Sequence, residues 1–336
     1  MDPLAVDAVG RVPHGSSDDP SVLDFSANTN PVTPDGLEAV YEDAFEAARS
    51  YPPEPPAEYV EAAADYVDCD PDDVISTPGG LAAIRLAIEI VVQSGDSVLV
   101  PAPSFGEYER EVRLQGATPA FVDHDRILDV DPADHAMAIV CQPNNPTGNA
   151  YDVDALERFA GDCREADTVL LVDEAFLDFT TRPSVAGTAG VVVARSLTKM
   201  FGLPGIRAGF AVAPGRIGAA LETARRPWNV GTPALRVGTH CLHRRDFVAD
   251  TRRRVRNERR RMRTRLSERF DVHPSDAPFL LVDVGDRSVE SVVEKARDRG
   301  IAIRDATTFR NLDSHVRVAV RLPRENDRLL SVLDDV

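Results

Sequence analysis

Four short motifs place chemically capable side chains directly after apolar runs of the chain. In chain order they contain Asn145, Asp173, Lys199 and Arg207. Each alone is a weak signal, because an acidic residue after a strand often caps a turn and a lysine in a loop is usually solvated. Together they offer an amide, a carboxylate, an amine and a guanidinium. Such a set can attach a carbonyl compound covalently, hold a protonated ring nitrogen and bind a phosphate.

Pyridoxal 5′-phosphate requires this combination of groups. It needs an amine for its Schiff base, a carboxylate to keep its pyridine nitrogen protonated, and cations with free backbone N–H groups for its phosphate. Lysine is scarce in this chain, since Lys199 and Lys295 are the two lysines among 38 basic residues. Lys295 lies in the helical pattern 288–299, where we expect a solvated side chain. Lys199 is therefore the candidate amine.

The elements that must position these residues alternate along the chain. Strands are predicted at 97–100, 120–122, 136–141, 168–172 and 191–194, and helices at 81–93, 107–115 and 153–166. Near-continuous apolar strands are typical of strands that are covered on both faces. The sequence therefore predicts an α/β fold with a mostly parallel, doubly wound sheet, whose ligands gather at the carboxyl ends of the strands.

The pattern changes after residue 233. A long helix is predicted at 234–269, followed by strands at 279–284, 301–304 and 316–320 and helices at 288–299 and 324–335. This predicts a smaller α+β domain. We divide the chain into an N-terminal arm that closes over the active site, 1–35, a large domain, 36–233, and a small C-terminal domain with its linking helix, 234–336.

An arginine-rich run at 251–265 has two interpretations, a polynucleotide site and a solvated helix face. The second is favoured, because Val255, Met262, Leu266 and Phe270 share the opposite face of one helix. The whole chain has 38 basic and 55 acidic residues, a net charge of −17, which argues against nucleic acid or an anionic membrane as partner.

Length and composition narrow the class of protein further. A chain of 336 residues, 43% of them hydrophobic, is typical of two globular domains or of one large domain with an appendage. Its apolar runs are too short to span a bilayer, and its N-terminus resembles no export signal, so we expect a cytoplasmic protein. The acidic, lysine-poor composition is consistent with a salt-adapted source or with neutral codon bias. The cysteines at 69, 141, 163 and 241 lack disulfide or metal spacing, so we expect reduced thiols and no metal.

The motifs resemble those of the pyridoxal-phosphate-dependent fold type I, aminotransferase-like superfamily over essentially the whole chain. The resemblance implies that Lys199 forms the Schiff base, that Asp173 pairs with the pyridine nitrogen and that Asn145 binds the ring oxygen O3′. The remaining implied cofactor contacts are Tyr51, Gly80, Leu81, Phe105, Ser196, Thr198 and Arg207. In relatives a tyrosine at the position of Tyr51 reaches the phosphate across a dimer interface, so the resemblance also implies a homodimer.

Within that superfamily the chain most resembles the L-threonine-O-3-phosphate decarboxylases of cobalamin biosynthesis. The segments 13–15, 23–31, 173–176, 227–230 and 316–321 carry this resemblance. It implies a small phosphorylated amino acid as substrate and (R)-1-amino-2-propanol O-2-phosphate as product. The implied substrate-binding residues are His14, Gly15, Asn28, Asn145, Arg304 and Arg317.

Two alternatives stay open. Histidinol-phosphate aminotransferases, and related amino-acid aminotransferases, are near relatives that typically have tyrosine where this chain has Phe176. That difference favours the decarboxylases, whereas the short glycine loop 79–82 is closer to the aminotransferase form. A non-catalytic regulator that keeps the fold is the other alternative. Such proteins usually carry an appended DNA-binding segment, for which a family-like region that starts near residue 13 leaves no room.

Overall fold

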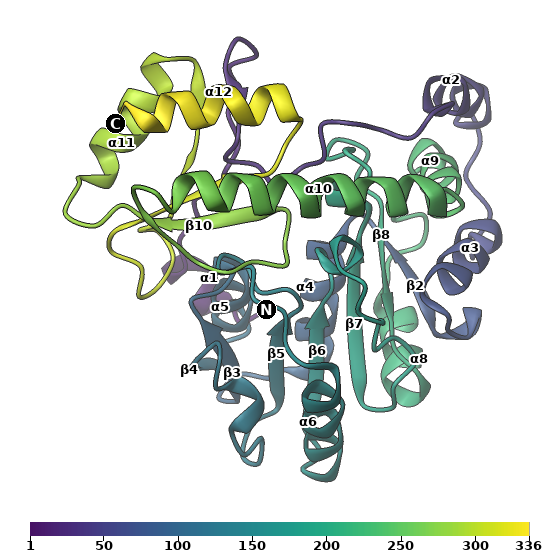
Figure 1. Cartoon of the computed structure of the whole chain (residues 1–336). Helices are drawn as coiled ribbons and strands as arrows, with labels where there is room; N and C mark the ends of the chain where they lie inside the picture. The colour runs from purple at the N-terminus through teal and green to yellow at the C-terminus, as the bar shows by residue number, and fades with distance from the viewer. Residues whose placement is uncertain (336) are drawn as a thin grey trace.

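A computed structural model describes residues 1–335 of the chain (Figure 1). Its largest element is a seven-stranded sheet. In spatial order the strands are β2 (Val74–Thr77), β8 (Gly209–Val212), β7 (Val191–Ser196), β6 (Val169–Asp173), β5 (Met137–Cys141), β3 (Ser97–Ala102) and β4 (Thr118–Asp123). All neighbouring pairs are parallel except the two that β8 makes with β2 and β7. The predicted α/β class with a mostly parallel sheet is confirmed.

Helices cover both faces of this sheet, which explains its apolar strands. One face packs against α4 (Gly80–Val91), α5 (Gly106–Leu114) and α8 (Gly215–Ala224). The other packs against α3 (Ala57–Val67), α6 (Val153–Glu165) and α9 (Thr232–Leu242), and α2 (Leu37–Ala47) packs in turn against α9. All five residues of β5 are buried, as a central strand between two helical layers requires.

A smaller, antiparallel sheet follows the large one. Its strand order is β12 (Arg304–Asp305), β13 (His315–Ala319), β10 (Phe279–Asp283) and β9 (Asp271–Val272), with helices α11 (Val289–Asp298) and α12 (Pro323–Asp334). Helix α10 (Arg245–Leu266) runs from beside α9 across to this sheet (Figure 1). Its buried residues include Val255, Met262 and Leu266, so the predicted amphipathic helix is confirmed.

The N-terminal segment pairs with a strand that directly precedes the small sheet's strand β12 in the chain. It contains α1 (Pro3–Ala8) and β1 (Leu23–Asp24), and β1 pairs in parallel with β11 (Ile301–Ala302). Short elements complete the fold: the 3₁₀ turns η1 (Pro71–Asp73), η2 (Ile127–Asp129) and η3 (Leu177–Phe179), and the one-turn helix α7 (Leu197–Met200). No helix in residues 1–335 is long and apolar enough to cross a membrane.

Two predictions about element boundaries are wrong. The single helix at 234–269 is two helices, α9 and α10, because Arg244 leaves the helical region with φ −91° and ψ 57°. The strand at 301–304 is two short strands, β11 and β12, which pair with different partners on either side of Ile303. The periodicity of apolar residues does not reveal either break, because both depend on the tertiary path of the chain.

Candidate active site

A cavity of about 370 Å³ opens where the carboxyl ends of β5, β6 and β7 meet the small sheet and the N-terminal segment. Asn145 follows β5, Asp173 ends β6 and Ser196 ends β7, so parallel strands deliver three separate motifs to one edge. The predicted residues that line this cavity are His14, Gly15, Asn28, Gly80, Leu81, Phe105, Asn145, Asp173, Ser196, Thr198, Lys199, Arg207, Arg304 and Arg317.

Lys199 and Asp173 form the electrostatic centre of the cavity. Burial, and then the nearby Arg317 cation, lower the pKa of the Lys199 amine to about 8, although Asp173 opposes this. A substantial fraction of the amine is therefore neutral, and hence nucleophilic, at neutral to mildly basic pH. Burial also raises the pKa of the Asp173 carboxyl. Two donors counter that effect, the Tyr108 hydroxyl at 2.6 Å from Oδ2 and the Ala175 N–H at 3.0 Å from Oδ1.

The loop before α4 forms a cradle that leaves no room for side chains. Gly79 has φ +95°, and a Cβ there would lie 2.6 Å from Nη2 of Arg207. At Gly80 a Cβ would lie 3.1 Å from the Cβ of Ser196. No side chain caps the first turn of α4, and the N–H groups of Gly80 and Leu81 have no hydrogen-bond partner among the described residues, so they are available to an anion. This close approach of bare backbone, a serine and an arginine suits a phosphate.

Arg207 is itself held in an unusual backbone conformation. Its φ is +57°, which is uncommon for a residue with a side chain, and its guanidinium donates to the carbonyls of Pro204 and Pro78, each at 3.2 Å. Backbone strain of this kind costs about 1–3 kcal/mol and concentrates at functional sites. The conformation fixes a cation beside the glycine cradle.

Arg317 and Arg304 bring cations from the small sheet. Arg317 is buried and donates to Oδ1 of Asn145 at 2.5 Å and to the Ser26 carbonyl at 3.0 Å. Burial and the neighbouring Arg304 lower the pKa of Arg317 to about 9. Its Nε, like Oδ1 of Asn28, is buried without a hydrogen-bond partner among the described residues. The unmatched Nε donor of Arg317, the cations and the glycine cradle fit a phosphate-bearing cofactor and an anionic substrate, whereas Oδ1 of Asn28 can accept a hydrogen bond from an N–H group of a ligand.

The structure does not bring Tyr51 into this cavity. Its side chain is 77% exposed, and its ring stacks on Trp228 with centroids 4.5 Å apart. The expected contact across a dimer interface therefore stays a prediction.

Two contacts of the site were not predicted from the sequence. Tyr108 binds Asp173, and Glu107 binds His14 through a contact of 3.0 Å between Oε1 and Nε2. Both residues lie in the first turn of α5, just after Phe105, in a motif from which the sequence predicts only a stacking aromatic ring. The sequence feature that could have indicated Tyr108 is its spacing from Phe105, because residues three positions apart lie on the same face of a helix.

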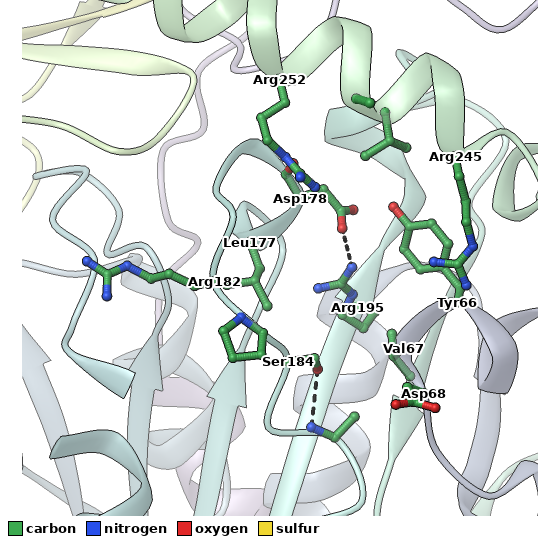
Figure 2. A pocket seen from close by; sticks show the side chains of 14 residues that line it. Tyr66, Val67, Asp68, Leu177, Asp178, Arg182, Ser184, Arg195, Arg245 and Arg252 are labelled. Carbon is green, nitrogen blue, oxygen red and sulfur yellow. Dashed lines mark hydrogen bonds and ion pairs between the residues drawn. The ribbon is translucent and has the colours of Figure 1, made fainter. Parts of the chain in front are cut away.

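A second, larger cavity of about 450 Å³ shares no lining residue with the first (Figure 2). It lies between the start of α10 and the region of β7 and η3. Its buried cation, Arg195, is neutralised by Glu174 at 3.1 Å and Asp178 at 2.5 Å. Glu174 is thus engaged in a buried ion pair, and the residues predicted to be catalytic, Lys199 and Asp173, line the first cavity.

Comparison with known proteins places the chain in a family. The profile of the family described as "Aminotransferase class I and II" matches residues 20–333. Histidinol-phosphate aminotransferase 2 of Archaeoglobus fulgidus is 30% identical over 333 residues, which cover 95% of this chain and 94% of that protein.

Solved structures show the same fold. L-threonine-O-3-phosphate decarboxylase from Porphyromonas gingivalis has a TM-score of 0.85 at 24% identity, covering 94% of this chain and 99% of the other. Histidinol-phosphate aminotransferase from Sinorhizobium meliloti, solved with pyridoxal 5′-phosphate, has a TM-score of 0.84 at 20% identity, covering 93% and 90%. The chain therefore belongs to the aminotransferase class I and II family, and its cofactor is pyridoxal 5′-phosphate.

Proposed function

We propose that this pyridoxal-phosphate enzyme decarboxylates L-threonine O-3-phosphate to (R)-1-amino-2-propanol O-2-phosphate, as in cobalamin biosynthesis. The observation that carries the proposal is Phe176. Its ring lines the cavity and packs edge-on against Phe279, with centroids 5.2 Å apart. A tyrosine there, as in the aminotransferase pattern, would donate a second hydrogen bond to the cofactor's O3′, worth about 0.5–1.5 kcal/mol. Because Phe176 has no hydroxyl group, Asn145 is the side chain that we assign to O3′.

Cofactor binding is assigned to residues that end or follow β2, β3, β5, β6 and β7, and to Arg207 before β8. Lys199 would attach to the cofactor, Asp173 would keep the proton on its ring nitrogen, and Asn145 would donate to O3′. Arg207, Ser196, Thr198 and the N–H groups of Gly80 and Leu81 would hold its phosphate, with Phe105 against the ring face. When bound, pyridoxal 5′-phosphate supplies a conjugated ring that accepts the electron pair released at the substrate's α-carbon.

Substrate binding is assigned to the two arginines of the small sheet. Arg317, joined to Asn145, would orient the carboxylate beside the cofactor, whereas Arg304, bound to the Pro13 carbonyl at 2.8 Å, would take the phosphate. His14, Gly15 and Asn28 of the N-terminal segment would close over it. The bond from the α-carbon to the carboxylate breaks, carbon dioxide leaves, and the Lys199 ammonium donates the proton that the α-carbon then needs.

Transamination of histidinol phosphate is the second candidate, and the names of the curated relatives favour it. The Archaeoglobus protein is a histidinol-phosphate aminotransferase, and so are two further relatives at 29% and 30% identity. The cationic cavity suits their substrate as well, because it too carries a phosphate and an amine. Decarboxylation and transamination differ in which bond of the substrate's α-carbon is held perpendicular to the cofactor ring.

One assay separates the two candidates. Purified enzyme loaded with pyridoxal 5′-phosphate is given L-threonine O-3-phosphate alone, and separately histidinol phosphate with 2-oxoglutarate. We expect carbon dioxide from the first mixture with no 2-oxo acid present. Turnover that occurs only in the second mixture would overturn the proposal in favour of transamination.

Two variants link the reaction to this cavity. Lys199→Ala should abolish turnover, and Arg317→Gln should raise KM for the substrate. Arg310→Gln is the matched control, because Arg310 lies outside the cavity and pairs with Glu109 at 3.1 Å. Turnover unchanged in Lys199→Ala would contradict the role assigned to this lysine. Cofactor binding with no turnover of either substrate would favour the regulator alternative.

We also propose that the enzyme is a homodimer. Four large aromatic side chains are exposed. Two are on α2, Tyr41 and Phe45, and the other two, Tyr51 and Trp228, stack on each other. Exposed aromatic side chains in this number are typical of an interaction surface. A partner subunit on this side would carry Tyr51 toward a neighbouring site.

A further inference from the structure

A buried carboxylate supports the histidine at the cavity rim. Nε2 of His14 lies 3.0 Å from Oε1 of Glu107. The two side chains differ in exposure: His14 lines the cavity with 52% of its side chain exposed, whereas 7% of the Glu107 side chain is exposed and it does not line the cavity. The proposed function uses His14 but gives no task to Glu107.

Positive charge lies beside the Glu107 carboxylate. Arg110 lies 3.4 Å from its second oxygen, and its place in the first turn of α5 puts it near the positive end of the helix dipole. An ionised carboxylate only accepts hydrogen bonds, so Nε2 of His14 must carry the proton in this contact. The opposite ring nitrogen, Nδ1, has no hydrogen-bond partner within residues 1–335 and is left for a ligand.

Arg304 lies on the same side of the cavity. It donates to the carbonyl of Pro13, the residue before His14, and a Cβ at Gly15 would lie 3.2 Å from its Cδ. His14 therefore lies between the Arg304 cation and the Glu107 carboxylate. The Phe105 ring, with its centroid 5.9 Å from that of the imidazole, is the neutral neighbour. A phosphate dianion bound by Arg304 and by Nδ1 would require an N–H at Nδ1 in addition to the one at Nε2, because phosphate oxygens accept hydrogen bonds.

We propose that Glu107 is a positioning residue that holds His14 by Nε2, so that Nδ1 meets the substrate phosphate and the imidazole stays doubly protonated while that phosphate is bound. This inference rests on the proposed phosphate-bearing substrate. It deepens that proposal, because it makes the affinity for phosphate depend on a carboxylate that never touches the ligand.

The test follows the ring nitrogens of His14 directly. Holoenzyme labelled with nitrogen-15 histidine is titrated at pH 7 with isopropyl phosphate, which has the phosphate of the substrate but no amine and therefore cannot react. A His14→Gln variant assigns the resonances. We expect both nitrogens of His14 to give protonated signals in the bound wild type. In Glu107→Gln we expect one protonated nitrogen and about tenfold weaker phosphate binding, from the loss of a charged hydrogen-bond acceptor.

Glu111→Gln is the matched control. Glu111 is also a buried carboxylate of α5, bound to Arg110 at 2.9 Å and Arg85 at 3.1 Å, but no contact joins it to His14 among the hydrogen bonds of the described chain. This variant should bind isopropyl phosphate as the wild type does. An equal loss in both variants, an unchanged His14 spectrum in Glu107→Gln, or no binding by the wild type would overturn the inference. Because the probe is unreactive, none of these outcomes depends on whether the enzyme decarboxylates or transaminates.

Discussion

Removing the hydroxyl of Tyr108 should weaken the folded protein in a manner that depends on pH. That hydroxyl donates to Oδ2 of the buried Asp173 at 2.6 Å. Burial raises the pKa of Tyr108 well above its usual value, so the hydroxyl remains a donor throughout the accessible range. The variant Tyr108→Phe removes only this oxygen from a side chain that is otherwise completely buried.

The magnitude follows from the charge of the acceptor. A hydrogen bond to an ionised carboxylate contributes about 1.5–3 kcal/mol, and one to a neutral carboxyl about 0.5–1.5 kcal/mol. The difference is about 1–1.5 kcal/mol, so losing Tyr108 should raise the pKa of Asp173 by about one further unit. Because the folded-state pKa of Asp173 already lies above its unfolded value, the free energy of unfolding falls as pH rises through that folded pKa. In Tyr108→Phe this fall continues to higher pH.

Urea unfolding of the cofactor-free protein at several pH values measures this effect. At pH 8 we expect Tyr108→Phe to lose about 1.5–3 kcal/mol of unfolding free energy, and we expect the deficit to shrink as pH falls toward 4. Tyr151→Phe is the matched control, since its hydroxyl donates to the neutral His124 carbonyl at 2.7 Å. That control should lose about 0.5–1.5 kcal/mol at every pH. A Tyr108→Phe deficit as flat with pH as the Tyr151→Phe deficit would refute the reasoning.

Three further outcomes are expected. Covalent capture of pyridoxal 5′-phosphate by the cofactor-free protein requires the neutral Lys199 amine, so its rate, followed by stopped-flow absorbance, should rise with pH and be half-maximal near the pKa of about 8; a flat rate would contradict this. Gly79→Ala should weaken cofactor binding about tenfold in equilibrium dialysis, because its Cβ would strike Arg207 and its φ of +95° strains any side chain. Trp228 is the single tryptophan and is 49% exposed, so its emission should shift to longer wavelength when the proposed dimer dissociates on dilution; a spectrum independent of concentration would argue against burial there.

The large sheet could be predicted from the sequence because its strands are buried on both faces. The central strands β7 and β5 contain nearly continuous apolar runs, and short runs of this kind, bounded by turn residues, are typical of buried strands. Strand β2 is four residues long, and Ser76 and Thr77 leave only two apolar residues in it, so no apolar run marks it. Strand β8 has the apolar run Phe210–Val212, but it is also only four residues long and begins at Gly209. Pairing between β1 and β11 joins residues almost 280 positions apart, and local patterns carry no information about it.

In the candidate site, too, some residues could be predicted from local sequence and others could not. Lys199 and Asp173 could be placed because lysine scarcity and strand ends restrict the choice of residue. Tyr108 and Glu107 could not, because a tyrosine or a glutamate in the first turn of a helix is ordinary until the fold shows what it faces. Their contacts with Asp173 and His14 span 65 and 93 positions. Supporting contacts of this kind depend on tertiary geometry, whereas the groups they support belong to motifs.

The charge distribution connects the site to the rest of the chain. The net charge is −17, yet the cavity gathers Lys199, Arg207, Arg304 and Arg317. Burial first, and then repulsion from neighbouring cations, lowers the pKa values of Arg317 and Lys199. Bound phosphate and carboxylate groups relieve that repulsion, so the same crowding that costs stability without a ligand becomes affinity for anions. At physiological ionic strength the repulsion from distant surface acids is screened beyond about 8 Å, whereas buried groups are screened much less. Selection of anions therefore takes place inside the cavity, despite the acidic surface around it.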